Sequence, residues 1–312
     1  MLKDVKKFLF TIFCHYLCCM KLISNNISPL PFYDSIEQQN HRKDYAFGQV
    51  YPLITYRNML LPFQIIIPPY FKNIPTAIGL YDYKTGESVS IVQSLIENGL
   101  ELLKYEGFNV LRYSALLPII EIKHEGLYYI EITFQDFNAG KFVIQTYYSE
   151  VFTVANVVDN CLLLEYGSDI NFNVNDVKID FSGGFKFKCY LNTQIGKPEY
   201  VFEEEATDRL GYSFIETQVS KKVYKFTFLA PEYLCDALRI VRLCNYKQIT
   251  SKGQVYSVSN FSITPEWQEQ GDLAAVECEF ETDTVIANLG GYIVEPSGKD
   301  FNDDFNNDFN IE

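Results

Sequence analysis

The segment Lys221–Thr282 constrains the fold more than any other part of the chain. Apolar and polar residues alternate in YKFTFLA (224–230), and this alternation predicts a strand. Pro231 follows at once and suits the first turn of a helix, where no backbone N–H donor is needed. Apolar residues then recur at helical spacing, at Leu234, Leu238 and Val241. The segment therefore predicts a strand that leads directly into a short amphipathic helix.

The remainder of this segment predicts a sheet for the helix to cover. Strand-like stretches follow at 248–251, 254–263 and 273–282, and Lys252-Gly253 marks a hairpin turn. Two earlier strands, at 161–167 and 185–191, extend the unit toward the N-terminus. The stretch EYVFEEEATDRLGY (199–212) is expected to be a charged connector, because its run of three glutamates suits a solvated face. One helix packed on an antiparallel sheet is an α+β domain.

The N-terminal half of the chain predicts a β-sandwich. Its strand-like stretches lie at 60–67, 76–83, 126–134, 141–148 and 150–157. Residues 89–104 fit either one helix or two short strands around Asn98-Gly99, and we expect strands. The Gly126-x-Tyr128 pattern ahead of a strand favours an immunoglobulin-like sandwich, although the usual core Trp and Cys pair are missing. The expected fold class is thus mainly β.

These patterns divide the chain into five parts. In order, they are a leader-like segment (1–19), an extended arm (20–44), the β-sandwich (45–158), the α+β domain (159–290) and an acidic Asn/Asp-rich tail (291–312). The tail is expected to be disordered, because regularly spaced Phe among Asn and Asp cannot build a core. The leader has three lysines before an apolar run, as a signal peptide does, but lacks a small-residue cleavage site. It is too short and interrupted for a membrane span, and Met20 is the alternative start.

Charge and cysteine usage limit the classes of partner and compartment. The formal net charge is −14, from 26 basic and 40 acidic side chains, so the chain is expected to repel nucleic acid. Aromatic residues make up 16% of the chain, as suits a β-rich core. Beyond the leader, the cysteines are odd in number and form no C-x-x-C pair; they are Cys161, Cys189, Cys235, Cys244 and Cys278. We expect them to be reduced, buried thiols.

The sequence offers no convincing catalytic, cofactor-binding or metal-binding residues. Its three histidines lie in three separate segments, and no nucleotide-binding loop or hydrolase motif occurs. The aspartates of the tail lack the glycine and terminal glutamate of a calcium-binding EF-hand loop. Two pairs of glutamates are reminiscent of a glycosidase carboxylate pair: Glu203 and Glu205, in the run expected to be a solvated face, and Glu277 and Glu279, which share one face of a strand. Their alternation points them to solvent, and we expect a chain that is not an enzyme.

Contact residues are easier to nominate than catalytic ones. Trp267 is the only tryptophan, and we expect it in a loop where it either anchors an interface or caps the core. Exposed tyrosines also favour contact surfaces, because they offer a large area with few rotatable bonds. The interface candidates are therefore Trp267, Tyr147, Tyr148 and Tyr233.

Several stretches of the chain resemble one family of proteins. They are SPLPFYDSIEQQNHRKDYAFGQVYPL, YYSEVFTV, LNTQIGKPEYVFEEEATDRLGY, KKVYKFTFLAPEYLCDAL and ITPEWQEQGDLAAVECEFETDT, within residues 28–284. They resemble virion-associated proteins of phages and prophages of Bacteroidota, including crAss-like phages. This resemblance implies a tail or neck protein and carries no catalytic signature. The leader departs from the family's usual start, which favours Met20 as the initiator.

Two functions follow as expectations. The first is a non-enzymatic structural or adaptor subunit of a phage tail, neck or baseplate, assembled in the host cytoplasm. It would form a homo-oligomeric ring and contact neighbouring virion proteins, without a cofactor, nucleic acid or a membrane span. The second is a secreted or surface-anchored adhesin that binds a surface glycan through Trp267, which requires a working export signal.

Overall fold

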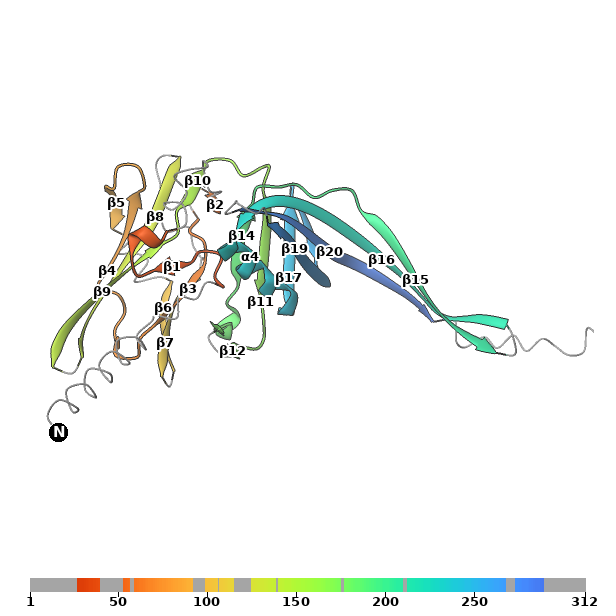
Figure 1. Ribbon diagram of the computed structural model, residues 1–312, viewed down its shortest axis with the longest axis horizontal. Helices are drawn as coiled ribbons and strands as arrows, with labels where there is room; N and C mark the ends of the chain where they lie inside the picture. The colour runs from red at the N-terminus through yellow and green to blue at the C-terminus, as the bar shows by residue number, and fades with distance from the viewer. Residues whose placement is uncertain are drawn as a thin grey trace, which may run out of the picture.

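The protein is mainly β in a computed structural model (Figure 1). The structure describes residues 27–39, 53–56, 59–91, 99–105, 107–114, 125–138, 140–174, 177–209, 212–267 and 273–288. Within these ranges there is one α-helix, α4 (Glu232–Arg239), and it continues as the 3-10 helix η3 (Ile240–Leu243). No helix in this part of the chain is long and apolar enough to cross a membrane.

The largest sheet has eleven strands. Their order is β1–β9–β8–β10–β2–β14–β11–β17–β18, with β4 paired to β8 and β5 paired to β4. The bounds are β1 Phe32–Tyr33, β2 Leu53–Tyr56, β4 Ala77–Asp82, β5 Ser88–Ile91, β8 Gly126–Asn138, β9 Lys141–Ser149, β10 Phe152–Ala155, β11 Leu162–Gly167, β14 Phe187–Leu191, β17 Tyr246–Ser251 and β18 Gln254–Ser257. Most strands expected from the sequence in these regions are present. The stretch 254–263, expected as one strand, is instead divided, because β18 ends at Ser257 and the next strand begins at Asn260 in a different sheet.

This sheet runs across the domain boundary that the sequence predicts near residue 158. Strand β10 pairs in parallel with β2, and β2 is linked to β14 by the pairing of Ile54 with Tyr190. A chain segment before residue 60 thus lies between strands of both halves. The boundary itself stays a prediction.

Two smaller sheets lie beside the large one. One has the order β3–β7–β6, with β3 Phe63–Ile67, β7 Phe108–Tyr113 and β6 Leu100–Tyr105, and the other pairs β12 Phe172–Val174 with β13 Val177–Ile179. Strands β5 and β6 confirm strand structure at both ends of residues 89–104, and residues 92–98 lie outside the described part of the chain. This part of the chain also holds two 3-10 turns, η1 Ile36–Gln38 and η2 Ser182–Gly184.

The fourth sheet carries the helix that the sequence predicts after Pro231. Its order is β15–β16–β20–β19, with β15 Glu199–Arg209, β16 Tyr212–Pro231, β20 Leu273–Asn288 and β19 Asn260–Trp267. Helix α4 contacts β16, β19 and β20 and buries Leu234 and Leu238 against them, while Arg239 stays exposed. Ring contacts such as Tyr224 with Phe280, at a centroid distance of 5.2 Å, fill the core beneath it.

Residues 199–212 are the main correction to the sequence interpretation. The expected connector is instead strand β15 and the start of β16, paired antiparallel from Glu199–Val223 to Arg209–Tyr212. Charged residues tolerate a strand conformation here because β15 is at the edge of its sheet, with solvent on both faces. The result is a ribbon that extends far from the rest of the protein (Figure 1).

Burial of the cysteines predicts how stability depends on pH. All five described cysteines are free, and burial raises the pKa of the Cys189 thiol to about 12 from its ordinary 9.0. Burial also raises the pKa of Cys278 well above 9.0. Because the folded pKa is raised, the stability that each thiol contributes is complete below pH 9 and is lost above it.

We therefore expect the free energy of unfolding to fall by about 1.4 kcal/mol per buried thiol between pH 8 and pH 10. Urea unfolding at the two pH values measures this change. The variant Cys189→Ala, compared with the wild-type chain, should show a smaller alkaline loss. An equal loss in both proteins would contradict a contribution from this thiol.

Candidate functional site

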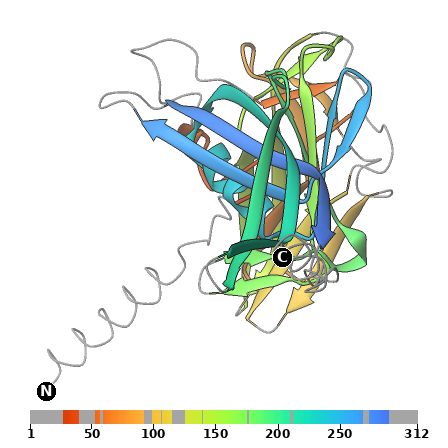
Figure 2. The ribbon, with the colours of Figure 1, turned by 90° about the vertical axis from the view of Figure 1, so that its right-hand side faces the viewer.

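The most distinctive feature of the structure is a projecting three-stranded ribbon. We call it the arm from here on, and it is separate from the extended segment expected at residues 20–44. The arm consists of β15 with the distal parts of β16 (212–223) and β20 (282–288), paired as one antiparallel ribbon. Strand β16 is 20 residues long. Its first half lies in the projecting ribbon, and its second half lies in the core. The arm projects away from the other sheets in Figure 1, and Figure 2 looks along it from its far end.

One face of the arm continues the core-facing side of the sheet. Within the body, the pairs Phe226–Cys278 and Tyr224–Phe280 are buried beneath helix α4. Alternate residues of a strand share a face, and directly paired residues lie on the same side. The next rows on this side, moving outward, are therefore Tyr200–Lys222–Thr282 and Phe202–Ser220–Val285. We call Tyr200, Phe202 and Val285 the arm's apolar face.

This apolar face lies open to solvent. Tyr200 is 63% exposed, Phe202 73% and Val285 64%, and Phe202 is the most exposed large apolar side chain among the described residues. The same alternation that buries aromatic rings in the body therefore places them in water on the arm. Exposed apolar residues that cluster in this way mark interaction surfaces more often than isolated ones do.

The opposite face of the arm is held by charge pairs. Lys221 lies 2.7 Å from Glu203, and Lys225 lies 3.1 Å from Glu199 and 3.7 Å from Glu279. The hydrogen bond to Glu203 raises the pKa of Lys221, and the bond to Glu199 raises that of Lys225. These pairs are exposed and add little to stability. Val201 and Ile286 are also exposed on this side, so its apolar groups are interrupted by charges.

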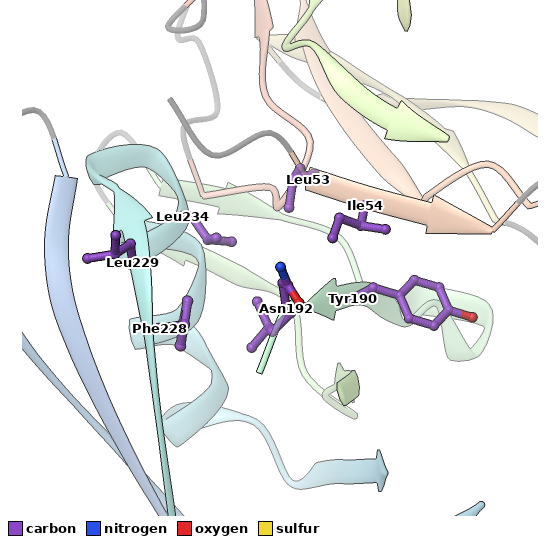
Figure 3. A pocket seen from close by; sticks show the side chains of 8 residues that line it. Leu53, Ile54, Tyr190, Asn192, Phe228, Leu229 and Leu234 are labelled. Atoms are coloured by element: carbon purple, nitrogen blue, oxygen red, sulfur yellow. The ribbon is translucent and has the colours of Figure 1, made fainter. Parts of the chain in front are cut away.

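A second feature is an apolar pocket where the arm's sheet meets the large sheet (Figure 3). Its volume is about 210 Å³, and its lining comes from β2, β14, the end of β16 and helix α4. The lining residues are Leu53, Ile54, Tyr190, Leu191, Asn192, Phe228, Leu229 and Leu234. None of them carries a charge, and Leu229 is half exposed at the rim.

A polar pocket in the described part of the chain is built largely from residues that form ion pairs. It is lined in part by Arg112, Glu101 and Lys188. Arg112 contacts both Glu101 and Asp180 at 2.6 Å, and Lys188 forms an ion pair with Glu165. A third cation of the lining, Lys186, lies over the ring of Tyr246. Arg112 and Lys188 are thus neutralised by carboxylates, and Lys186 has an aromatic contact.

The carboxylate pair that the sequence singles out has no enclosed site. Glu277 and Glu279 project from the outer face of β20, and Glu279 lies near Lys225. Neither residue lines the apolar or the polar pocket. Within the described ranges no group of three or more His, Cys, Asp or Glu side chains is placed to hold a metal ion.

The four interface candidates from the sequence differ in their exposure. Trp267 is 48% exposed and forms the last residue of β19, opposite Ala274, so it lies in a strand and the expected loop position is wrong. Tyr148 is partly exposed on the outer face of β9. Tyr147 and Tyr233 are buried, because Tyr147 packs edge-on against Phe134 and Tyr233 belongs to the covered face of α4. Neither of these two side chains is open to a partner.

Sequence reasoning missed the arm and a second exposed cluster. Phe137 and Phe142 are paired directly across the β8–β9 hairpin, and Ile144 lies on the same side; all three are more than half exposed. This hairpin projects from the opposite end of the protein to the arm (Figure 1). The sequence signal for the arm is the run Tyr200-Val201-Phe202, because all three residue types favour strands.

Comparison with known proteins finds no relative of this chain. No family model, curated protein or solved structure matches this chain.

Proposed function

We propose that the chain is a structural or adaptor subunit that works through protein–protein contacts and is not an enzyme. The observation that supports this proposal is the arm's apolar face, which continues the core surface of the body into solvent. An enclosed catalytic site would place perturbed polar groups in a pocket, whereas in the polar pocket Arg112 and Lys188 are held by neighbouring carboxylates and Lys186 lies over the Tyr246 ring.

Energetics favour a partner for this surface. Full burial of a large apolar side chain contributes about 1.5–3 kcal/mol relative to exposure. Tyr200, Phe202 and Val285 forgo most of this contribution in the isolated chain, since each is more than 60% exposed. A partner that covers the face would recover it without any rearrangement of the ribbon.

The sequence resembles virion proteins of Bacteroidota phages, and this resemblance is the basis for proposing the assembly in which the subunit works. We assign it to a phage tail, neck or baseplate, assembled in the host cytoplasm with neighbouring virion proteins. In this proposal, residues 45–158 form an immunoglobulin-like sandwich and residues 159–290 form an α+β domain. A projecting arm suits such an assembly because it reaches beyond the body of its own subunit.

Co-expression with the products of the neighbouring genes tests this function. The tagged full chain should purify together with itself or with one of these proteins, in a complex of defined size by light scattering. A chain that stays monomeric at high concentration and binds none of the neighbouring products would contradict the proposal.

The alternative function, a glycan-binding adhesin, is favoured by the half-exposed ring of Trp267. Because this is the only tryptophan, the protein's fluorescence reports directly on sugar stacking against it. For an assembly subunit, we expect no change in emission when a panel of bacterial surface glycans is titrated in. A saturable change that is lost in Trp267→Phe would instead support the adhesin.

A further inference from the structure

We propose that the arm of one subunit docks on a second copy of this chain, with Phe202 seated in the second copy's apolar pocket. This inference rests on the proposed assembly function and names its partner. Each copy then offers one arm and one pocket, so the contact is heterologous and joins copies head to tail. Such contacts close into rings when the rotation between copies permits.

The pocket and the side chain match in size and chemistry. An apolar cavity of about 150 Å³ holds one benzene ring. The pocket of about 210 Å³ therefore has room for a single phenyl ring, and its lining is free of charged residues. Phe202 presents such a ring, 73% exposed, on the apolar face of the arm.

The geometry of β16 prevents Phe202 from filling the pocket of its own chain. Phe202 is paired with Ser220, and Phe228 lines the pocket, so the two sites lie eight residues apart along one strand. At about 3.4 Å per residue this separation is about 27 Å. A Phe202 that is seated in such a pocket therefore belongs to a different molecule from the pocket. The pockets of successive copies then lie about 27 Å apart, or less where the strand is curved.

Charge argues against the symmetric alternative, in which two arms pack face to face. Residues 199–223 and 282–288 hold seven acidic and three basic side chains, for a net charge of −4. Two arms in contact would bring two such surfaces together, and like charges repel. In the head-to-tail contact only one such surface is present, and the residues that line the pocket carry no charge. The face is also small for a stable two-fold interface, which usually buries about 800 Å² on each partner.

A photo-crosslinker tests the contact directly. We would place p-benzoylphenylalanine at position 202 of the full chain, irradiate it at high concentration and identify the crosslinked peptides by mass spectrometry. The expected partners are peptides that contain residues 53–54, 190–192 or 228–234 of another copy. The same crosslinker at position 201, on the opposite face of β15, serves as the matched control and should not label these peptides.

A blocked pocket establishes the direction of the contact. Leu229→Arg fills the rim at a half-exposed position and should leave the fold intact, as a thermal melt would verify. A chain with both the crosslinker and Leu229→Arg should still label a wild-type copy but not a copy with Leu229→Arg. In a separate measurement, Phe202→Ala should weaken self-association by about 30-fold, as for a central interface residue.

Other crosslinks would overturn the inference. They include peptides of a second arm around residues 200–202 or 285, of the hairpin at 137–144, or of the segment 289–312. Labelling of a different virion protein alone would also overturn it while leaving the proposed function standing. A chain that labels neither itself nor any neighbouring product would contradict both.

Discussion

Replacing Asp180 with alanine is expected to lower the free energy of unfolding by about 3–5 kcal/mol, as for a broken buried ion pair. Asp180 is almost fully buried and lies 2.6 Å from the Arg112 guanidinium, which is itself 8% exposed. Asp180 also accepts a hydrogen bond from the Ser182 hydroxyl at 2.9 Å. The substitution leaves the Arg112 cation buried with only the half-exposed Glu101 as its carboxylate partner. Urea unfolding followed by circular dichroism measures the loss.

Two controls separate this effect from a general sensitivity of the fold. Glu203→Ala removes an exposed ion pair with Lys221 on the arm and should leave the unfolding midpoint unchanged. The double variant Arg112→Met/Asp180→Val removes both buried charges and should be more stable than Asp180→Ala alone. Equal destabilisation by Asp180→Ala and Glu203→Ala would contradict this account of the ion pair.

The double variant Tyr200→Ser/Phe202→Ser is expected to weaken assembly by about 100-fold or more, because two adjacent aromatic anchors are lost. Both side chains are exposed in the isolated chain, so its unfolding stability should stay close to that of the wild type. Sedimentation velocity over a range of concentrations, with the neighbouring gene products present in a second series, measures the association.

The opposite face of the arm supplies the matched control. Val201→Ser/Ile286→Ser removes two exposed apolar side chains from the face that carries the ion pairs. This variant should assemble almost as well as the wild type. Loss of assembly in both double variants would show that the arm acts as a whole and not through its apolar face.

The helix and most strands could be predicted because their information is local. Pro231 marks the start of the helix, and the apolar spacing of Leu234 and Leu238 gives its buried face. Alternation in residues 224–230 and 273–282 correctly predicted strands whose facing rows are buried. The turn at Lys252-Gly253 is confirmed, with both residues at positive φ.

The arm could not be predicted because its conformation depends on distant pairing. Three consecutive glutamates at 203–205 suit a solvated loop as well as an edge strand, and only the ladder to β16 decides between them. Whether a tyrosine is buried or exposed also depends on contacts between segments that are distant in the sequence. Tyr147 and Tyr148 are neighbours in β9, yet one is buried against Phe134 and the other faces outward. The pairing of β2 with β14 likewise joins segments more than 100 residues apart.

The apolar pocket shows the same limit for the candidate site. Its lining combines Leu53 and Ile54 with residues from 190 to 234, which no spacing in the sequence brings together. Tyr233, one of the interface candidates from the sequence, lies on helix α4, and the structure puts the next residue, Leu234, in the pocket wall. Glutamates flank the aromatic residues of the arm, and this setting favours a solvated connector when the sequence is considered alone.

Hydrogen–deuterium exchange of residues 199–205 tests the central claim, that the arm's apolar face is covered in an assembly. The outer edge of β15 has no strand partner among the described residues, so its free amides should exchange rapidly in the dilute chain. In the assembled sample, the account predicts markedly slower exchange of these amides, with no such change in Tyr200→Ser/Phe202→Ser at the same concentration. Equally rapid exchange in the dilute and assembled wild-type samples would contradict it.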